Sequence, residues 1–203
     1  MRVHASAVTA ALLAAALTAC GGDDDEPAKQ QPTKASSPQE ASHDADAKTL
    51  KLGEPAQTTG DGGTGVLQIT PDTVVFRKKA SGESAKYGIF VVVTMKDKAM
   101  TAAAADEVAP ISGGGWSWIA PDGETIGFDS GNSTMVTMDR YDNADPVQPG
   151  TYQWRAQVFD LTPAQAKGGT LLYTDGEEAA YRWKMPSSDS GPRVAEVKKQ
   201  LQY

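Results

Sequence analysis

The sequence Tyr87-Gly88-Ile89-Phe90-Val91-Val92-Val93-Thr94-Met95 decides the fold of this chain. The run is short, continuous and rich in β-branched residues, which is typical of a strand with both faces buried. We expect residues 87–95 to form the central strand of the folded part. Two further strands, residues 65–70 and 72–78, are predicted before it, on either side of Pro71.

The clearest strand pattern in the chain follows a turn at Pro149-Gly150. In residues 152–158 apolar and polar residues alternate, which indicates a strand with one solvent-facing side. The expected apolar face consists of Tyr152, Trp154, Ala156 and Val158, and the expected solvent face of Gln153, Arg155 and Gln157.

Two turn sequences predict hairpins. Pro121-Asp122-Gly123 predicts a tight turn before a return strand at residues 126–129, because proline fixes φ and glycine accepts the positive φ that a reversal needs. Asp175-Gly176 predicts a two-residue hairpin turn after a strand at residues 170–174. The strand that follows it alternates between apolar and basic residues: Tyr181, Trp183 and Met185 against Arg182 and Lys184.

The remaining segments complete the prediction of an all-β fold. Residues 133–140 are expected to form a short strand, and residues 102–105 one helical turn or a loop. Val194, Val197 and Leu201 recur at helical spacing, which predicts a short C-terminal helix. Several strands with frequent turns and no long amphipathic helices between them predict an antiparallel β-sandwich.

A family resemblance rests on several of these segments. They are the valine-rich strand, the Pro-Asp-Gly turn, Pro149-Gly150 before Thr151-Tyr152, Val158-Phe159-Asp160, and Leu171-Leu172-Tyr173-Thr174-Asp175-Gly176. Together they resemble the immunoglobulin-like domain of unknown function of actinobacterial surface lipoproteins. The resemblance implies an immunoglobulin-like sandwich over residues 49–187 and a location at the cell surface. It implies no activity, because the family has none that is agreed.

The N-terminal segment has the pattern of an export signal. Arg2 is followed by a mostly apolar stretch at residues 5–16, which is shorter than the roughly 20 residues of a membrane-spanning helix. Leu17-Thr18-Ala19-Cys20 then resembles the bacterial lipobox, and Cys20 is the only cysteine in the chain. The resemblance implies a signal peptide at residues 1–19, a diacylglycerol lipid on the Cys20 thiol, and a stable anchor in the outer leaflet, since two acyl chains bind a bilayer firmly.

The segment after Cys20 is predicted to be a disordered linker. Residues 20–48 are acidic and proline-rich with almost no large apolar side chain, so little would offset the entropy of ordering them. Asp23-Asp24-Asp25-Glu26 would keep the linker extended by charge repulsion. The sequence therefore predicts four parts: a signal peptide at residues 1–19, a linker at 20–48, a sandwich domain at 49–187 and a tail at 188–203.

Composition excludes several kinds of chemistry. The chain has 203 residues and a formal net charge of −7, which disfavours nucleic acid as a partner. The only histidines are His4 and His43, in the predicted signal and linker, so the folded part lacks the residues of Ser-His-Asp and Cys-His sites and of common zinc sites. We expect no cofactor and no enzymatic activity, with a carboxylate-dependent wall hydrolase or a calcium-dependent module as the alternative.

Three sets of residues are candidates for binding. Asp139, Asp142, Asn143 and Asp145 form an oxygen-rich loop that could hold calcium, although such residues also cluster in loops because they bond their own backbone. Trp116 and Trp118 share one side of a strand and either stack on a ligand or fill the core, which is the commoner fate. Arg155, Arg182 and Lys184 would form a basic stripe on neighbouring strands, or pair with nearby acids.

These predictions describe a monomeric, lipid-anchored protein on the extracytoplasmic face of the cell membrane. Its sandwich would bind an envelope protein or wall polymer through a sheet face or through loops at one end.

Overall fold

Two β-sheets form the framework of residues 49–202, which the computed structural model describes apart from the side chain of Ile111. The predicted signal sequence, Cys20 and the linker lie outside the described residues. Among residues 49–202, no helix has the length and apolar composition that a membrane crossing requires.

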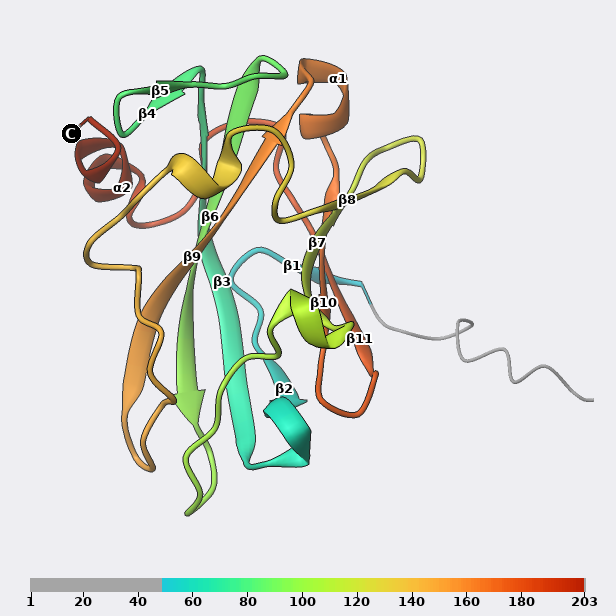
Figure 1. The fold of residues 1–203 in the computed structure, drawn as a ribbon, viewed down its shortest axis with the longest axis vertical. Helices are drawn as coiled ribbons and strands as arrows, with labels where there is room; N and C mark the ends of the chain where they lie inside the picture. Colours follow the sequence, from blue (N-terminus) through green and yellow to red (C-terminus); the bar gives the residue numbers. More distant parts are fainter. Residues whose placement is uncertain (1–48, 203) are drawn as a thin grey trace, which may run out of the picture. The chain divides into compact units, whose positions relative to one another are not determined.

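The four-stranded sheet is antiparallel throughout and contains the longest strands (Figure 1). Its order is β2 (Ala56–Thr59), β3 (Val66–Arg77), β6 (Ile89–Ala99) and β9 (Tyr152–Leu161). Strand β6 pairs along its length with β3 on one side and β9 on the other, which confirms the prediction of a central strand.

The five-stranded sheet packs against the first and has shorter strands. Its order is β1 (Leu50–Lys51), β11 (Ala180–Lys184), β10 (Thr170–Thr174), β7 (Gly115–Ile119) and β8 (Thr125–Gly127). Strand β1 runs parallel to β11, and the other pairs are antiparallel. A separate short hairpin joins β4 (Lys79–Ala80) to β5 (Glu83–Ser84).

The helices are short and lie outside the sheets. They are α1 (Pro163–Ala166), α2 (Val194–Gln200) and the 3₁₀ turns η1 (Asp61–Gly63), η2 (Pro110–Ser112) and η3 (Ser133–Met135). The C-terminal helix was predicted, and Val197 and Leu201 are buried as its spacing requires.

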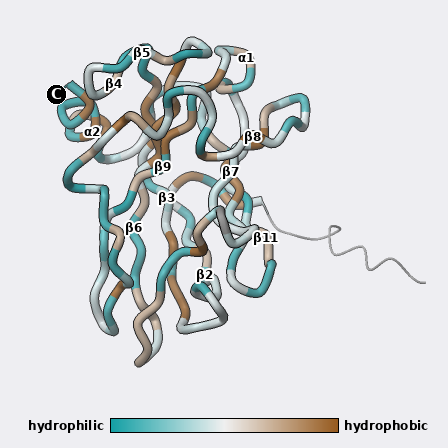
Figure 2. The backbone as a smooth tube through the Cα atoms, in the orientation of Figure 1, coloured by the Kyte–Doolittle hydropathy of each residue, from teal (hydrophilic) through white to brown (hydrophobic). Residues whose placement is uncertain are grey.

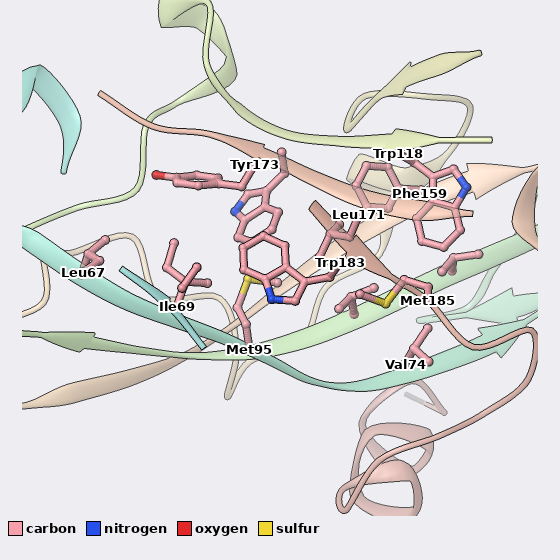
Figure 3. Packing of buried hydrophobic residues seen from close by; sticks show 14 of the residues in the cluster. Leu67, Ile69, Val74, Met95, Trp118, Phe159, Leu171, Tyr173, Trp183 and Met185 are labelled. Atoms are coloured by element: carbon pink, nitrogen blue, oxygen red, sulfur yellow. The ribbon is translucent and has the colours of Figure 1, made fainter. Parts of the chain in front are cut away.

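The main core lies between the two sheets and is rich in large aromatic rings (Figure 3). Trp118 packs on Phe159 with ring centroids 5.8 Å apart, and Trp116 packs on Tyr173 at 4.7 Å. Hydrophobic and hydrophilic residues alternate along the strands, so each sheet turns one apolar side inward (Figure 2). The two inward faces enclose a core that needs no disulfide.

A second apolar cluster covers part of the outer face of the four-stranded sheet. Val197 of α2 and Leu201 at its end pack there against Val92 and its neighbours, together with Met138 and Tyr141 of the η3–β9 loop. This cluster corrects the predicted faces of β9, because the apolar residues Trp154, Ala156 and Val158 face α2 and the loop. Arg155, predicted to face solvent, instead points between the sheets and is buried.

Three local predictions are also corrected. Residues 65–70 and 72–78 form one strand, β3, with an irregularity between Pro71 and Thr73, because proline has no N–H to continue the ladder. Residues 133–140 form no strand: Met135 N–H donates to Asn132 O and Val136 N–H to Ser133 O, which closes a 3₁₀ turn.

The predicted two-residue turn at Asp175-Gly176 is a longer loop, residues 175–179, between β10 and β11. The Asp175 carboxylate accepts the backbone N–H groups of Glu177 and Ala179, and Glu178 has φ of 64°. Side-chain bonding to its own loop therefore replaces the tight turn.

The turn at Pro121-Asp122-Gly123 agrees with the prediction. Gly123 has φ of 94°, and Ala120 and Glu124 pair across the turn through Ala120 N–H and Glu124 O at 2.8 Å. Residues 102–105 form a loop, in which Ala105 pairs with Val147.

Candidate functional site

Trp116 and Trp118 lie in the core and offer no ring to a ligand. Their exposed fractions are 2% and 0%, which confirms the prediction that they fill the core. The Trp118 indole N–H donates to the carbonyl of Gln165, and the Trp116 indole N–H donates to Glu107 Oε2 at 2.9 Å. Both polar ring atoms are thus satisfied inside the protein.

The predicted basic stripe does not exist, because its residues belong to different sheets. Arg155 is on β9 of the four-stranded sheet and points into the interior, whereas Arg182 and Lys184 are on β11 of the five-stranded sheet. Trp183 between them is buried, so Arg182 and Lys184 lie on the opposite, outer side of β11. The Lys184 ammonium donates to the carbonyl of Gly168.

The loop that carries the calcium candidates is open to solvent. Asp139, Asp142 and Asp145 are exposed, and the described part of the chain contains no group of three metal-ligating side chains that could hold an ion. The Asn143 amide donates to the carbonyls of Arg140 and Trp154, so it fastens the loop to β9.

The strongest concentration of charge lies between the sheets around Arg155. We call Asp97, Asp106, Glu107 and Arg155 the acid–arginine cluster. Arg155 Nη1 lies 2.7 Å from Asp106 Oδ1 and 3.7 Å from Glu107 Oε2, and Arg155 Nε lies 3.6 Å from Asp97 Oδ2. Arg155 Nη2 donates to the carbonyl of Asp145 at 2.8 Å. Three carboxyl groups therefore share one guanidinium.

The surroundings of Asp97 disfavour its charged form. Its side chain is fully buried, and among the described residues neither of its oxygens accepts an ordinary hydrogen bond. Burial, and then the charge of Glu107, raise the pKa of Asp97 well above its usual range, and Arg155 only partly opposes this. The charged form of Asp97 is therefore disfavoured inside the folded domain.

This carboxyl pair is enclosed by protein. The side chains of Asp97, Arg155 and Glu107 have exposed fractions of 0%, 8% and 9%. The alternative prediction of a wall hydrolase requires two carboxyl groups that a sugar can reach, and a substrate in solution does not reach these two in this structure. Their geometry suits a structural cluster that fixes the loops above it.

A pocket of about 500 Å³ lies at the loop end of the sandwich. Three loops form it: β2–β3, β6–β7 and β10–β11. We call it the loop-end pocket, and its lining residues are Asp61, Gly62, Val108, Ser112, Gly113, Gly114, Thr174, Asp175, Gly176 and Glu178. Asp61 and Glu178 are exposed, and the lining contains no lysine or arginine.

The acid–arginine cluster is connected to this pocket through the β6–β7 loop, in which Glu107 is followed by the lining residue Val108. Val108 N–H donates to the Tyr173 hydroxyl at 2.9 Å, and Glu107 precedes Val108 in the same loop. Burial and the nearby charge of Glu107 raise the pKa of Tyr173 far above its usual range. The floor of the pocket is therefore fixed by buried polar contacts rather than by loop residues alone.

Asp175 fastens the other two loops together. Its Oδ2 accepts the backbone N–H of Thr59 at 2.9 Å and the Tyr181 hydroxyl at 3.1 Å, while Oδ1 accepts two N–H groups of its own loop. Because Thr59 ends β2, this carboxylate joins the β2–β3 and β10–β11 loops. Both oxygens of Asp175 are therefore occupied by hydrogen bonds that hold the loops together. Asp61 and Glu178 are the acidic lining residues that are exposed and could contact a ligand.

Two of the three glycines at residues 113–115 are required by close packing. A Cβ on Gly115 would lie 2.6 Å from the carbonyl of Val108, and one on Gly114 would lie 2.7 Å from the Val108 side chain. Gly115 also has φ of 79°, which only glycine adopts easily. These glycines let the β6–β7 loop fold down onto the core and shape the pocket wall.

Sequence reasoning missed Asp97, Asp106 and Glu107. One signal was present: in β6 the residues at alternate positions from Val91 to Ala99 are apolar except Asp97, so a charge stands at a core position. Its partners could not be found in this way, because Asp106 and Glu107 come from a loop without periodicity.

Comparison of the chain with protein-family models, with curated proteins and with solved structures found no match. The arrangement of the loops and charges described above is therefore the basis for any functional inference.

Proposed function

We propose that the protein is a lipid-anchored envelope protein whose immunoglobulin-like domain is a binding module that holds its ligand in the loop-end pocket. The proposal places the protein on the extracytoplasmic face of the membrane through a diacylglycerol on Cys20. The lipobox-like sequence before Cys20 supports the anchor, and the acidic, proline-rich residues 20–48 support an extended linker.

The strand order supports an immunoglobulin-like topology. If β3, β6 and β9 correspond to strands A, B and E, then β7, β8, β10 and β11 correspond to C, C′, F and G. The sheets then read A-B-E and G-F-C-C′, which is the division of an immunoglobulin domain without its D strand. Trp118, buried on β7, agrees with the tryptophan expected on strand C.

The observation that carries the binding role is the loop-end pocket itself. Under the same correspondence, β6–β7 and β10–β11 are the B–C and F–G loops, which in variable domains form part of the ligand-binding end. Fixed loops suit binding because less conformational entropy is lost when the ligand arrives. The acids Asp61 and Glu178 at the rim favour a ligand that carries positive charge or hydrogen-bond donors.

A substitution that fills the pocket tests the proposal. Ser112 is exposed and lines the pocket, so Ser112→Trp should block it without entering the core. The full chain, purified in detergent, is sedimented with detergent-washed cell-envelope fragments. We expect the wild type to sediment with them and Ser112→Trp to remain in solution.

The matched control is Ser84→Trp, an exposed serine on β5 at the other end of the domain (Figure 1). It should sediment like the wild type. Equal sedimentation of both variants and the wild type would show that the pocket is not the binding site, and no sedimentation of the wild type would contradict an envelope ligand.

A further inference from the structure

A second surface, distinct from the loop-end pocket, lies on the outer face of the four-stranded sheet. Helix α2 and the η3–β9 loop cover one half of this face and leave the other half open. In the open half one row of directly opposed residues crosses all four strands, namely Gln57, Gln68, Lys98 and Tyr152. Strands lie about 4.8 Å apart, so this row is about 14 Å across.

A second row, Thr70, Lys96 and Trp154, lies next to the first. We call the two rows together the aromatic–lysine face. Directly opposed residues in antiparallel strands point to the same side of a sheet, and the intervening residue Asp97 is buried in the interior. The side chains of both rows therefore point outward, and neither row contains a carboxylate.

The centre of this face is an exposed aromatic group with a cation beside it. Tyr152 is 53% exposed and meets Trp154 edge to face, with ring centroids 5.9 Å apart and planes at 79°. The Lys96 ammonium lies 4.1 Å from the centre of the Tyr152 ring. Arg193 stacks on Trp154 and pairs with Asp72 at 2.7 Å, so Trp154 is held in place beneath Tyr152. The exposed ring is thus fixed before any ligand arrives.

One further exposed apolar residue lies at the edge of this face. Met100, 41% exposed, follows Lys98 at the end of β6 and shares its outward direction. Large exposed aromatic and apolar side chains that gather with polar neighbours mark interaction surfaces. This face therefore has the composition of a binding surface and not of an ordinary solvated sheet.

We propose that the aromatic–lysine face binds a polysaccharide that carries widely spaced acidic groups. The amides of Gln57 and Gln68 and the hydroxyl of Thr70 both donate and accept hydrogen bonds, which matches the hydroxyl groups of a sugar. The Tyr152 ring offers a flat surface for the C–H face of a sugar ring, and Lys96 and Lys98 attract isolated carboxylates or phosphates.

Charge argues against denser polyanions as the ligand. The whole chain has a formal net charge of −7, so a polymer such as nucleic acid, with one charge every 1.7 Å or so of helix axis, is repelled from most of the molecule. Two lysines suit a ligand with few charges and many hydroxyl groups. A purely acidic polypeptide would leave the neutral amides and the ring without matched partners.

Affinity electrophoresis of the full chain in detergent tests this inference with three polymers. Hyaluronan carries one carboxylate on every second sugar, dextran is neutral, and poly-glutamate is acidic without sugar. We expect hyaluronan to retard the wild type and the other two to leave its mobility unchanged. The variant Lys96→Gln/Tyr152→Ala should raise the dissociation constant for hyaluronan at least about tenfold.

A second lysine–tyrosine pair provides the matched control. The Lys86 ammonium lies 5.3 Å from the ring centre of Tyr87, which is 47% exposed and lies outside the aromatic–lysine face. Lys86→Gln/Tyr87→Ala should bind hyaluronan like the wild type. The Ser112→Trp variant should also bind it unchanged, which separates this inference from the loop-end pocket.

The inference is overturned if hyaluronan fails to retard the wild type, or if Lys96→Gln/Tyr152→Ala is retarded equally. Equal retardation by poly-glutamate would show an acidic protein partner instead, and equal retardation by dextran would show that charge plays no part.

Discussion

Asp97 is a single buried residue whose ionisation affects the stability of the domain. It stands at a core position of β6, yet it is an acid whose nearest cation, Arg155, is shared with Asp106 and Glu107. A buried carboxyl group is tolerated when it is neutral, since ionisation without full compensation is costly. The protonation state of Asp97 should therefore be visible in the stability of the whole domain.

The first prediction concerns pH. Because burial and Glu107 raise the folded-state pKa of Asp97, its contribution to stability is complete below about pH 4 and is lost as pH rises through the raised value. We expect the free energy of unfolding of the wild type to fall with pH relative to Asp97→Asn, which does not ionise. Urea unfolding of both proteins at a series of pH values measures the difference.

Asp139→Asn is the control, because Asp139 is exposed in a loop away from the interior. Its unfolding free energy should follow the wild type at every pH. Parallel curves for Asp97→Asn and the wild type would show that the pKa of Asp97 is not raised in the folded protein.

The second prediction concerns the cation of the acid–arginine cluster. Arg155→Met leaves Asp97, Asp106 and Glu107 without their positive charge, which should cost about 3–5 kcal/mol of unfolding free energy. Adding Asp97→Asn should recover part of that loss, since one acid is then removed. Denaturant unfolding of the wild type, the two single variants and the double variant gives the coupling free energy between Arg155 and Asp97.

Arg140 provides an exposed comparison. Its guanidinium pairs with Glu196 at 2.5 Å, but its side chain is 53% exposed. Arg140→Met should cost about 1 kcal/mol or less. A loss for Arg155→Met as small as that for Arg140→Met would contradict the view that the cluster fixes the interior.

At the scale of elements, the contact between β10 and β7 depends on a glycine. Gly169 lies just before β10, and a Cβ at this position would come 2.4 Å from the Trp118 ring. Trp118 is also held by its indole bond to Gln165 at 2.9 Å, so the ring cannot move away freely. The start of β10 and the end of β7 therefore fit only because this residue has no side chain.

The third prediction tests that fit. Gly169→Ala should destabilise the protein by about 1–3 kcal/mol through overpacking and should change the tryptophan fluorescence of the folded state. Gly127→Ala is the control, because its Cβ would approach only the end of the exposed Asp129 side chain. Thermal unfolding of the two variants measures the difference. Equal melting temperatures for Gly169→Ala and Gly127→Ala would refute the predicted clash with Trp118.

The elements differ in how well the sequence predicts them. Strand β6 was predictable because its valine run has one interpretation, and β10, β11 and α2 followed from periodicity. The faces of β9 were assigned wrongly because both sides of this strand are covered from Trp154 onward, one by the other sheet and one by α2 and the η3–β9 loop. Periodicity locates a strand, but contacts between distant segments decide which side is buried.

The candidate sites were less predictable than the strands. Trp116 and Trp118 were recognised as core residues, but the loop-end pocket needs three loops that are far apart in the sequence. The aromatic–lysine face likewise arises only when β2, β3, β6 and β9 align in register. Neither Tyr152 nor Lys96 carries a local signal that distinguishes it from an ordinary strand residue.

At the scale of the whole molecule, the fourth prediction concerns the anchor. If Cys20 carries the diacylglycerol that its sequence context predicts, Cys20→Ala should prevent lipid attachment and reduce the amount of mature protein in the membrane fraction. Cell fractionation with mass spectrometry of the N-terminal peptide measures this. An unmodified Cys20 in the wild type would contradict the proposed lipid anchor. The same share of protein in the membrane fraction for Cys20→Ala and the wild type would contradict it as well.

The short parallel strand β1 has a mechanical consequence. Every residue before Thr49 is joined to the domain through this strand, so a pull along the chain reaches β1 first. Only Leu50 and Lys51 pair with β11, whereas β3, β6 and β9 are paired along most of their length. Under tension β1 should detach first and lengthen the chain slightly, while the two sheets and the surfaces built on them keep their shape.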